Sequence, residues 1–403
     1  MKVLQINAVF GTSSTGTIVK DIHKLSEVNG ISSYIAYSID ANHYTQIPNS
    51  YRIGSYLSKK LHAILSRISG KQAYYSRIST WLLIRWIQYV QPDIVHLHNL
   101  HSNYINLNSL LKYLAKTNIP TVITMHDCWY FTGGCFHYTS VRCDKWKSTC
   151  GSCPKRYQDT PAYIYDSSST ILKDRVRYLS QISNLVFVGC SNWILKQLQE
   201  SRLREVGKNL CIYNGFDLDV FRPIETDIKE KLGLNGYKLM IGPASKWLSI
   251  ENNEALEYFI KNMPHRCILL LFGYSGPKIK ISENVHLYGY MSSPNEMAKL
   301  YSAADVLVNC SREDTLSSIN IEAQACGTPT VAYDSTGNKE TIDSLSGYAV
   351  ETGDYKELFN SAIKILDFDK SSLSRMCRNY VKLNFDKDVN YQKYIDLYNS
   401  LLD

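Results

Sequence analysis

Two carboxylates, Asp314 and Glu322, flank a run of small and polar residues in the stretch SREDTLSSINIEAQACGTPTV, which begins at Ser311. Small residues at the start of a helix let an anion or sugar hydroxyls reach the backbone N–H groups, where the helix dipole is positive. A carboxylate about one turn further along can accept two hydrogen bonds from a vicinal diol such as a ribose. The pattern therefore predicts a binding site for a nucleotide. A solvated acidic loop, in which Asp314 caps the helix, is the alternative.

A second candidate site is the glycine-containing bend FGTSSTG, which spans residues 10–16. Glycines between a strand and a helix let a phosphate approach the backbone, so Gly16 is a candidate phosphate contact. The bend has neither a GxGxxG fingerprint nor the Walker lysine, so it predicts neither a dinucleotide site nor a P-loop. Taken alone, it describes only a flexible connection between a strand and a helix.

Short apolar runs that alternate with helical patterns must position these sites. Several runs are apolar throughout, as expected of parallel strands that are covered on both faces. Capping patterns mark helix starts at Ser293 and Asp354. The expected strands are 3–9, 33–37, 93–98, 121–125, 185–189 and 210–213, followed by 238–241, 267–272, 285–287, 305–309, 330–333 and 348–350.

Two consecutive series of this kind predict an α/β fold with two doubly wound, Rossmann-like domains and a ligand cleft at the carboxyl ends of their strands. The length of 403 residues also favours two domains. Turn formers around Asn214 place the joint, which gives a first domain at 1–215 and a second at 216–385. We expect the aromatic C-terminal helix, within 386–403, to pack back onto the first domain.

Composition limits the environment and the partners. The sequence is 44% apolar and 20% charged, with no apolar run of the roughly 18–20 residues that a membrane span needs and no signal-peptide pattern. We therefore predict a cytoplasmic protein, in which the eleven cysteines stay reduced. The formal charge of +7 suits a phosphate-bearing substrate, a lipid surface or nucleic acid. Nucleic acid is not predicted, because no binding motif accompanies the charge.

A basic and aromatic helical region suggests peripheral contact with an anionic membrane at the inner face of the cytoplasmic membrane. The alternative is a solvated helix face over ordinary core aromatics. The residues concerned are Lys59, Lys60, Arg67, Lys71, Arg77 and Arg85 with Ile64, Ile68, Tyr74, Tyr75, Trp81, Leu82 and Trp86.

Four cysteines, Cys135, Cys143, Cys150 and Cys153, lie in a long segment with glycine-containing turns and no periodic element. Ordering such a segment costs about 1–2 kcal/mol per residue, so something must hold it in place. Four thiolates can close around one structural zinc ion. Reduced structural cysteines, with the segment held by aromatic packing, are the alternative.

Several motifs together resemble the retaining glycosyltransferases of family 4, which have the GT-B fold. The similarity extends over almost the whole chain, and it is strongest to bacterial enzymes of capsule, exopolysaccharide and O-antigen synthesis, which share HDxWxFTGGC and CGxCP. The motifs are SSTG at 13–16, DIVHLHNLH at 93–101, TMHDCW at 124–129, IYNGFDLDVF at 212–221, GYMSSPNEMAKLYSAADVLV at 289–308 and EDTLSSINIEAQACGTPTVA at 313–332.

The resemblance implies a nucleotide-sugar donor, most often UDP-linked, and a lipid-linked or oligosaccharide acceptor. It implies that Glu322 holds the ribose and that Gly16 lies near the diphosphate. His126 and Asp127 match the catalytic segment, and His98 and His101 fall on the acceptor side, where a structural role for one of them is the alternative. Further donor contacts are expected at Lys246, Glu313, Asp314, Leu316 and Ser317.

The sequence departs from the family pattern at one place, because the usual Arg and Lys of the diphosphate clamp align with Ile250 and Glu251. Lys246 is the nearby cation that could substitute as a point charge. Retention is generally assigned in this family to front-face attack assisted by the leaving phosphate, which removes the need for a nucleophilic carboxylate. The Asp-x-Asp triplets at 217/219, 367/369 and 386/388 are interpreted as turn and cap residues away from the predicted donor loops, so no cofactor is expected for catalysis. The alternatives are another GT-B enzyme, such as a nucleotide-sugar epimerase, or a non-catalytic partner that binds sugar nucleotides.

Overall fold

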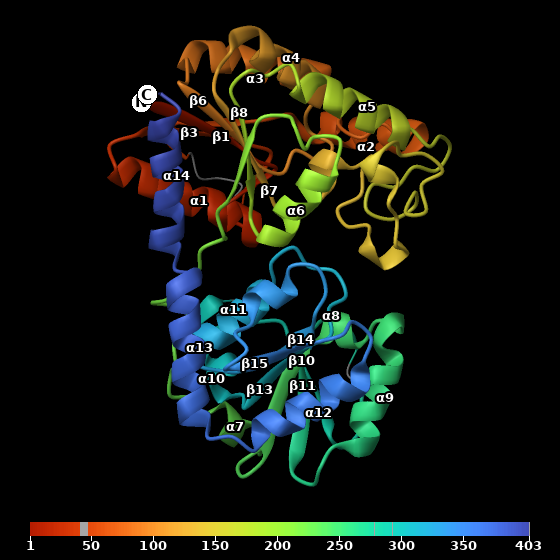
Figure 1. Ribbon diagram of the computed structural model, residues 1–403, viewed down its shortest axis with the longest axis vertical. Coiled ribbons are helices and arrows are strands. Elements are labelled where there is room, and N and C mark those ends of the chain that lie inside the picture. Colours follow the sequence, from red (N-terminus) through yellow and green to blue (C-terminus); the bar gives the residue numbers. More distant parts are fainter. Residues whose placement is uncertain (41–46, 278, 292, 403) are drawn as a thin grey trace. The chain divides into compact units, whose positions relative to one another are not determined.

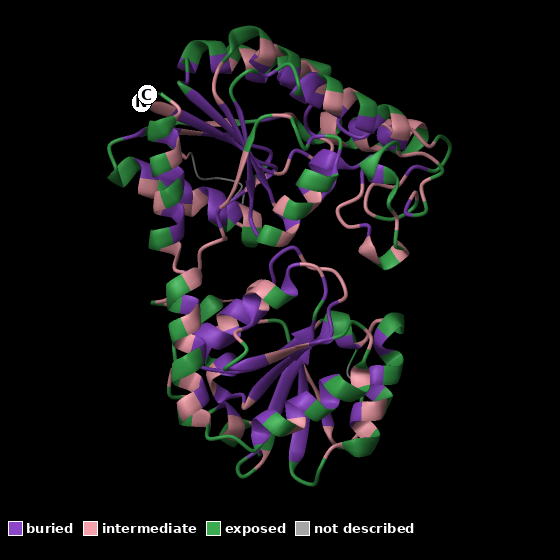
Figure 2. Ribbon diagram, viewed as in Figure 1, coloured by how far each residue is buried: buried purple, intermediate pink, exposed green. Residues whose placement is uncertain are grey.

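The computed structural model describes residues 1–40, 47–277, 279–291 and 293–402, and the chain separates into two compact units (Figure 1). Unit 1 consists of Met1–Asn214 with Asp388–Asp403, and unit 2 consists of Gly215–Lys387. Each unit is built on one parallel sheet. Figure 2 shows that the strands of both sheets are largely buried and that the surrounding helices expose their outer faces.

In unit 1 the sheet has the strand order β5-β3-β1-β6-β7-β8-β9, with every neighbouring pair parallel. Two short strands, β2 (Val9–Phe10) and β4 (Ile39–Asp40), form a separate parallel pair. The strands of the main sheet are β1 (Lys2–Ile6), β3 (Ser32–Tyr37), β5 (Ser50–Arg52), β6 (Ile94–Leu97), β7 (Thr121–Met125), β8 (Leu185–Gly189) and β9 (Lys208–Cys211).

Helices cover this sheet, and three 3-10 turns lie in the segment that follows β7. The α-helices are α1 (Ser13–Val28), α2 (Tyr56–Ser69), α3 (Arg77–Val90), α4 (Leu107–Thr117), α5 (Ser168–Leu179), α6 (Asn192–Glu200) and α14 (Lys387–Ser400). The 3-10 turns are η1 (Trp129–Phe131), η2 (Thr139–Val141) and η3 (Lys145–Lys147).

In unit 2 the order β12-β11-β10-β13-β14-β15 is that of a doubly wound sheet, again with parallel neighbours. Its strands are β10 (Lys238–Pro243), β11 (Cys267–Tyr274), β12 (Val285–Gly289), β13 (Val306–Asn309), β14 (Thr330–Tyr333) and β15 (Gly347–Val350). Its helices are α7 (Ile228–Lys231), α8 (Ala244–Trp247), α9 (Asn253–Asn262), α10 (Pro294–Ala303), α11 (Ser318–Ala325), α12 (Tyr355–Leu366) and α13 (Lys370–Asn384), with 3-10 turns η4 (Ile250–Asn252) and η5 (Asn338–Thr341).

Local sequence signals account for much of this arrangement. Strands β7, β8, β13 and β14 are buried at every position, which explains their unbroken apolar or small-residue character. The Ser293 side chain accepts from the N–H of Glu296, and that of Asp354 accepts from Glu357, so both expected helix starts are confirmed.

The C-terminal helix α14 packs onto the sheet of unit 1, as expected from its aromatic residues. Tyr391, Tyr394 and Tyr398 are buried in the same core cluster as Val3 and Val122. The Tyr398 hydroxyl also lies 2.6 Å from Nδ1 of His96, inside the sheet. The chain therefore returns to its first unit to complete that core.

No helix among the described residues combines the length and the apolar character needed to cross a membrane.

In both units, the strand order reverses beside the first strand. The reversal falls between β1 and β6 in unit 1 and between β10 and β13 in unit 2. Ligands of open parallel sheets bind at the carboxyl ends of the strands flanking such a reversal. The loops that follow these four strands are therefore the places to look for chemistry.

Candidate active site

The loop after β13 in unit 2 is fixed by a buried network of amides and hydroxyls. Asn309 Nδ2 donates to Ser317 Oγ at 3.1 Å and to Asn320 Oδ1 at 2.9 Å. Asn309 Oδ1 accepts from the N–H of Ser311 at 3.0 Å, and Asn320 Nδ2 donates to Thr341 Oγ1 at 2.9 Å. Asn309, Ser311, Ser317 and Asn320 are all buried. Buried side-chain hydrogen bonds thus fix the backbone at the start of α11, so its geometry does not depend on a ligand.

The acidic residues of this loop are held through their backbone. The N–H of Asp314 donates to Thr336 Oγ1 at 2.8 Å, and its carbonyl accepts from the N–H of Gly337 at 2.9 Å. The Glu313 carbonyl accepts from Ser311 Oγ at 3.1 Å. No described residue accepts a hydrogen bond from the backbone N–H of Leu316 or Ser317. Two donors therefore stand at the positive end of α11, where an anion is stabilised.

Glu322 lies on α11, partly buried, with the Tyr301 hydroxyl donating to its Oε2 at 3.0 Å. Tyr301, on α10, is fully buried. Burial raises the pKa of Glu322 to about 7, and the hydrogen bond from Tyr301 works in the opposite direction. A carboxylate so placed is about half ionised near neutral pH, and the ionised form would be favoured by a diol that donates to it.

The basic groups of unit 2 differ from the sequence expectation. Lys246 lies on α8 after β10, and its side chain is exposed. A second cation was missed: Arg312, on the loop after β13, donates from Nη2 to the Glu251 carbonyl at 2.9 Å and from Nε to Asn252 Oδ1 at 3.3 Å. Its guanidinium therefore lies against the segment where the family pattern expects a cation, although it comes from another part of the chain.

Unit 1 gathers three histidines at the ends of two neighbouring strands. His98 follows β6 and His126 follows β7, and His98 Nδ1 lies 3.2 Å from His126 Nε2. His98 Nε2 lies 3.2 Å from Gln5 Oε1, and the same amide donates from Nε2 to the Val19 carbonyl at 3.3 Å. The Gln5 oxygen thus faces His98, which makes His98 Nε2 a donor and His98 Nδ1 an acceptor.

The series of hydrogen bonds from Gln5 through His98 determines the tautomer of His126. Since His98 Nδ1 accepts, His126 Nε2 must donate, and the lone pair of His126 lies on Nδ1. That atom is buried and has no hydrogen-bond partner among the described residues. Burial lowers the pKa of His126 to about 4, so the ring is neutral at neutral pH. His126 Nδ1 is therefore an acceptor that awaits a hydroxyl.

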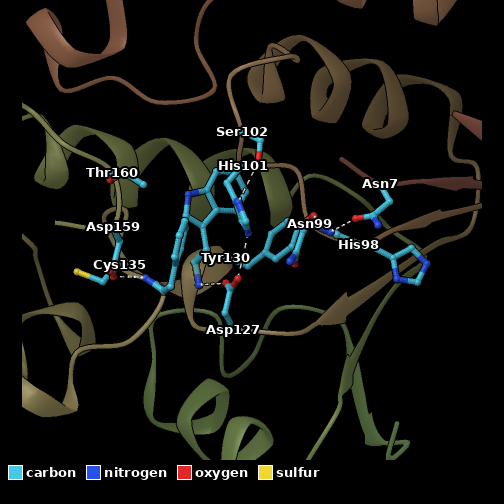
Figure 3. A network of polar contacts seen from close by, with 12 residues as sticks. Asn7, His98, Asn99, His101, Ser102, Asp127, Tyr130, Cys135, Asp159 and Thr160 are labelled. Atoms are coloured by element: carbon cyan, nitrogen blue, oxygen red, sulfur yellow. Dashed lines mark hydrogen bonds and ion pairs between the residues drawn. The ribbon is translucent and has the colours of Figure 1, made fainter. Parts of the chain in front are cut away.

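Asp127, the next residue, makes two hydrogen bonds within unit 1 (Figure 3). Its Oδ2 lies 3.1 Å from His101 Nε2, and its Oδ1 accepts from the N–H of Trp129 at 2.8 Å. Burial alone would raise the pKa of Asp127, but His101 and the backbone N–H together lower it. Asp127 is thus an ionised carboxylate, and it orients the ring of His101. Each of its oxygens accepts one hydrogen bond within unit 1.

Gly16 lies where the first helix of unit 1 meets the loop after β1. A Cβ there would come within 3.1 Å of a Val9 methyl and 3.3 Å of the Gly11 nitrogen, so a larger residue would have to push these neighbours away by a few tenths of an ångström. The Asn7 carboxamide oxygen accepts from the N–H of Asn99, which joins this loop to the one after β6 (Figure 3). The loops of Gly16, His98 and His126 are therefore neighbours.

The four predicted metal-binding cysteines lie together in the segment after β7, where all four line one small cavity. Within the described ranges, no three His, Cys, Asp or Glu side chains already stand in an arrangement that holds a metal ion.

Two family models match the chain. The model described as Glycosyltransferase Family 4 matches residues 59–220, and the model described as Glycosyl transferases group 1 matches residues 277–383. The first match includes His98, His101 and His126, and the second includes the loop after β13 and Glu322.

Relatives agree with these matches. The chain is 23% identical over 381 residues to a protein of Escherichia coli (strain K12), WcaC, whose name describes a glycosyl transferase of colanic acid biosynthesis; the match covers 89% of each chain. It is 25% identical over 209 residues to the UDP-Gal:alpha-D-GlcNAc-diphosphoundecaprenol alpha-1,3-galactosyltransferase of Escherichia coli, which covers 46% of this chain and 53% of that one.

Among solved structures, the sucrose-phosphate synthase of Thermosynechococcus elongatus superposes with a TM-score of 0.70 at 17% identity, covering 100% of this chain and 99% of that one. This likeness concerns the fold of the chain.

Proposed function

Because this chain is a glycosyltransferase of the GT-B type, with a family 4 domain followed by a group 1 domain, we propose that it transfers a sugar, with retention of configuration, from a UDP-sugar to a lipid-linked or growing polysaccharide. The observation that carries the proposal is the donor-type loop of unit 2, where unpaired backbone donors and Glu322 occur together. The name of one relative supports the acceptor class, since it describes galactosyl transfer to a lipid diphosphate.

Unit 2 would hold the donor. In this proposal the Glu322 carboxylate accepts from the ribose diol, and the N–H groups of Leu316 and Ser317 face the diphosphate. Asp314 and Glu313 stand on the same loop and would meet the sugar. The departing diphosphate gains negative charge, which fixed donors and cations stabilise. Lys246 and Arg312 are the cations that the loops after β10 and β13 supply.

Unit 1 would supply the acceptor side and the neutral His126. A hydroxyl of the bound sugar donating to His126 Nδ1 would fix the orientation of the ring. Positioning of this kind lowers the barrier by avoiding rearrangement at the moment of reaction. Each Asp127 oxygen already accepts one hydrogen bond, which makes the carboxylate a weaker nucleophile. This favours front-face attack, in which the leaving phosphate oxygen takes the acceptor proton.

A screen of nucleotide-sugars with polyprenyl-diphosphate-linked sugar acceptors tests the proposal. We expect the mass of the acceptor to increase by one sugar residue, with release of the nucleoside diphosphate. Isomerised donor without transfer would instead favour an epimerase, and binding without any turnover would favour a sugar-nucleotide binding partner. The anomeric configuration of the product, read by NMR, tests retention separately.

A lipid-linked acceptor requires access to a membrane, and one face of unit 1 suits that contact. On α2, Leu57, Leu61, Ile64 and Ile68 recur with helical spacing and are 77%, 57%, 53% and 42% exposed. On α3, Ile78, Trp81 and Leu82 are also exposed. The two helices meet where Ser58 Oγ lies 3.4 Å from Ser79 Oγ.

The apolar face continues onto a third segment. The N–H groups of Tyr163 and Tyr165 donate to the carbonyls of Arg67 and Ile68 at 2.7 and 3.1 Å, which joins this segment to the end of α2. Tyr163, Ile164 and Tyr165 are all exposed. Large contiguous exposed apolar surfaces of this kind mark membrane or protein contacts.

The positive charge of this region favours an anionic membrane as the partner of the apolar face. Between Asp40 and Asp93 the sequence contains seven Lys and Arg residues and no Asp or Glu, which equals the formal net charge of +7 of the whole chain. Basic residues around an apolar face favour the surface of an anionic bilayer. We therefore propose that this face rests on anionic lipid.

Vesicle flotation tests the contact. We expect co-flotation with vesicles rich in phosphatidylglycerol, weaker binding to phosphatidylcholine, and loss of binding in a Leu61→Ser, Trp81→Ser double variant. Leu383→Ser is a matched control, because Leu383 is 81% exposed on α13 of unit 2. Equal binding to both lipids, or equal loss in the control, would contradict the assignment.

A further inference from the structure

Four half-buried cysteines of unit 1 lie around one small cavity in a segment with little regular structure. Cys135, Cys143, Cys150 and Cys153 together line this cavity, whose volume is about 20 Å³. A cavity of this size holds one water-sized species, since a water needs about 10–15 Å³ by this measure. It suits a single ion and is too small for an iron–sulfur cluster.

The chain packs closely around one of the four cysteines. A Cβ at Gly133 would come within 2.5 Å of the Ser168 carbonyl oxygen and 2.9 Å of the Cys150 Cβ, so only glycine allows this close approach. The segment is therefore packed tightly against Cys150.

A buried cation lies next to the same cysteines. Arg175 is 2% exposed, stacks over Trp129 at 3.7 Å and donates to the carbonyls of Trp129 and Thr132. Its Nε and Nη2 have no hydrogen-bond partner in the part of the chain that the structure describes. Asp127 and Cys150 are both among the acidic groups close enough to act on its charge. A buried cation is stabilised by nearby negative charge.

We propose that Cys135, Cys143, Cys150 and Cys153 bind one zinc ion as four thiolates. Zinc prefers thiolate ligands in a tetrahedron with Zn–S distances of about 2.3 Å. Four thiolates around Zn²⁺ carry a net charge of −2. Because Cys150 lies near Arg175, this negative charge would face the buried guanidinium. Binding draws the four sulfurs together around the ion and releases the thiol protons to solvent.

The site would be structural. Four protein ligands leave no open position for a water or a substrate. The ion would nevertheless support the active site, because Phe136 follows Cys135 directly and its ring packs on that of His101 at 4.4 Å. The Phe136 N–H donates to Asp159 Oδ2 at 2.8 Å. Fixing Cys135 thus fixes the ring that supports His101, the partner of Asp127.

Metal analysis tests the proposal without any use of activity. Elemental analysis of protein purified without added metal should give about one zinc per chain. Cys150→Ser and Cys153→Ser should each lose most of it. Cys211→Ser is the matched control, because Cys211 is also half-buried but lies on β9, and it should keep its zinc.

A second measurement covers the case in which the cysteine variants do not fold. In the wild-type protein, titration with an organomercurial should release zinc to a colorimetric chelator in proportion to thiol modification. Zinc far below one equivalent with thiols that react freely in the folded protein would overturn the proposal. So would disulfides among the four cysteines, or zinc that persists in both cysteine variants.

Discussion

Replacing Glu322 with glutamine should make the protein more stable at alkaline pH and at the same time weaken its hold on the donor. Burial raises the pKa of Glu322 from an ordinary value of 4.5 to about 7. Between these two values the folded state binds the proton more tightly than the unfolded state does. The contribution of protonated Glu322 to the free energy of unfolding is therefore fully present below about pH 4.5, and it is lost as the pH rises through 7.

The size of the effect follows from the pKa difference. One pKa unit corresponds to about 1.4 kcal/mol, so the ionised carboxylate costs up to about 3 kcal/mol above pH 7. This is an upper limit, because the residue is partly exposed. Glutamine carries no charge at any pH, so the Glu322→Gln variant should lack this loss. A difference of this size raises a melting temperature by several degrees in a domain of this length.

Thermal unfolding of the wild type and the variant from pH 5 to pH 8 measures the effect. We expect similar midpoints at pH 5 and a growing advantage of Glu322→Gln towards pH 8. Glu257→Gln is the control, because Glu257 is exposed on α9 and should show no such trend. The reasoning is refuted if the midpoints of wild type and Glu322→Gln keep a constant difference across this range.

Donor binding should depend on pH in the opposite sense. About nine in ten Glu322 carboxylates are ionised at pH 8 and about one in ten at pH 6, so affinity for a ribose diol should fall roughly tenfold on acidification. Calorimetry with UDP-glucose suits this test, because its diphosphate is a diester and does not titrate in this range. Glu322→Gln should bind more weakly at pH 8 and should lose the pH dependence.

Arg312→Ala should lower turnover by about a hundredfold if its guanidinium stabilises the departing diphosphate, with Arg312→Lys in between, and steady-state kinetics would show it. His126→Ala should reduce kcat far more than donor affinity, which turnover assays and calorimetry separate; equal effects on both would remove it from the reacting geometry. Gln5→Leu should let both tautomers of His126 appear in ¹⁵N NMR and reduce kcat, while Gln5→Glu, which still accepts from His98, should preserve the tautomer.

Most of the fold could be predicted, because buried parallel strands are marked by continuous apolar runs. The exceptions have physical reasons. Strand β5 (Ser50–Arg52) is short, polar and at the sheet edge, so it has no apolar signal. The first expected strand extended to residue 9, whereas β1 ends at Ile6, since the chain turns there to place Asn7 beside Asn99.

The candidate site was only partly visible in the sequence. The loop of Asp314 and Glu322 is contiguous, so its spacing could be interpreted directly. Arg312 was missed because its partner Glu251 is 61 positions away. Gln5 was missed for a similar reason, since its link to His98 depends on the pairing of β1 with β6.

The basic and aromatic region shows a different limit of sequence reasoning. Helical periodicity predicts apolar stripes, but it does not say whether a stripe faces the core or solvent. Trp86 packs against Tyr51 at 5.2 Å, whereas Trp81, five positions earlier on the same helix, is 56% exposed. One helix of this region therefore carries both a packed and an exposed tryptophan, which the periodicity alone does not tell apart.

The most direct test of the proposed function is a transfer reaction with isotopically labelled nucleotide-sugar and a polyprenyl-diphosphate-linked sugar as acceptor. Mass spectrometry should show the labelled sugar on the acceptor together with free nucleoside diphosphate, and NMR should show the anomeric configuration of the donor retained in the product. A donor that is isomerised, hydrolysed without acceptor or left unchanged across the nucleotide-sugar panel would contradict the assignment.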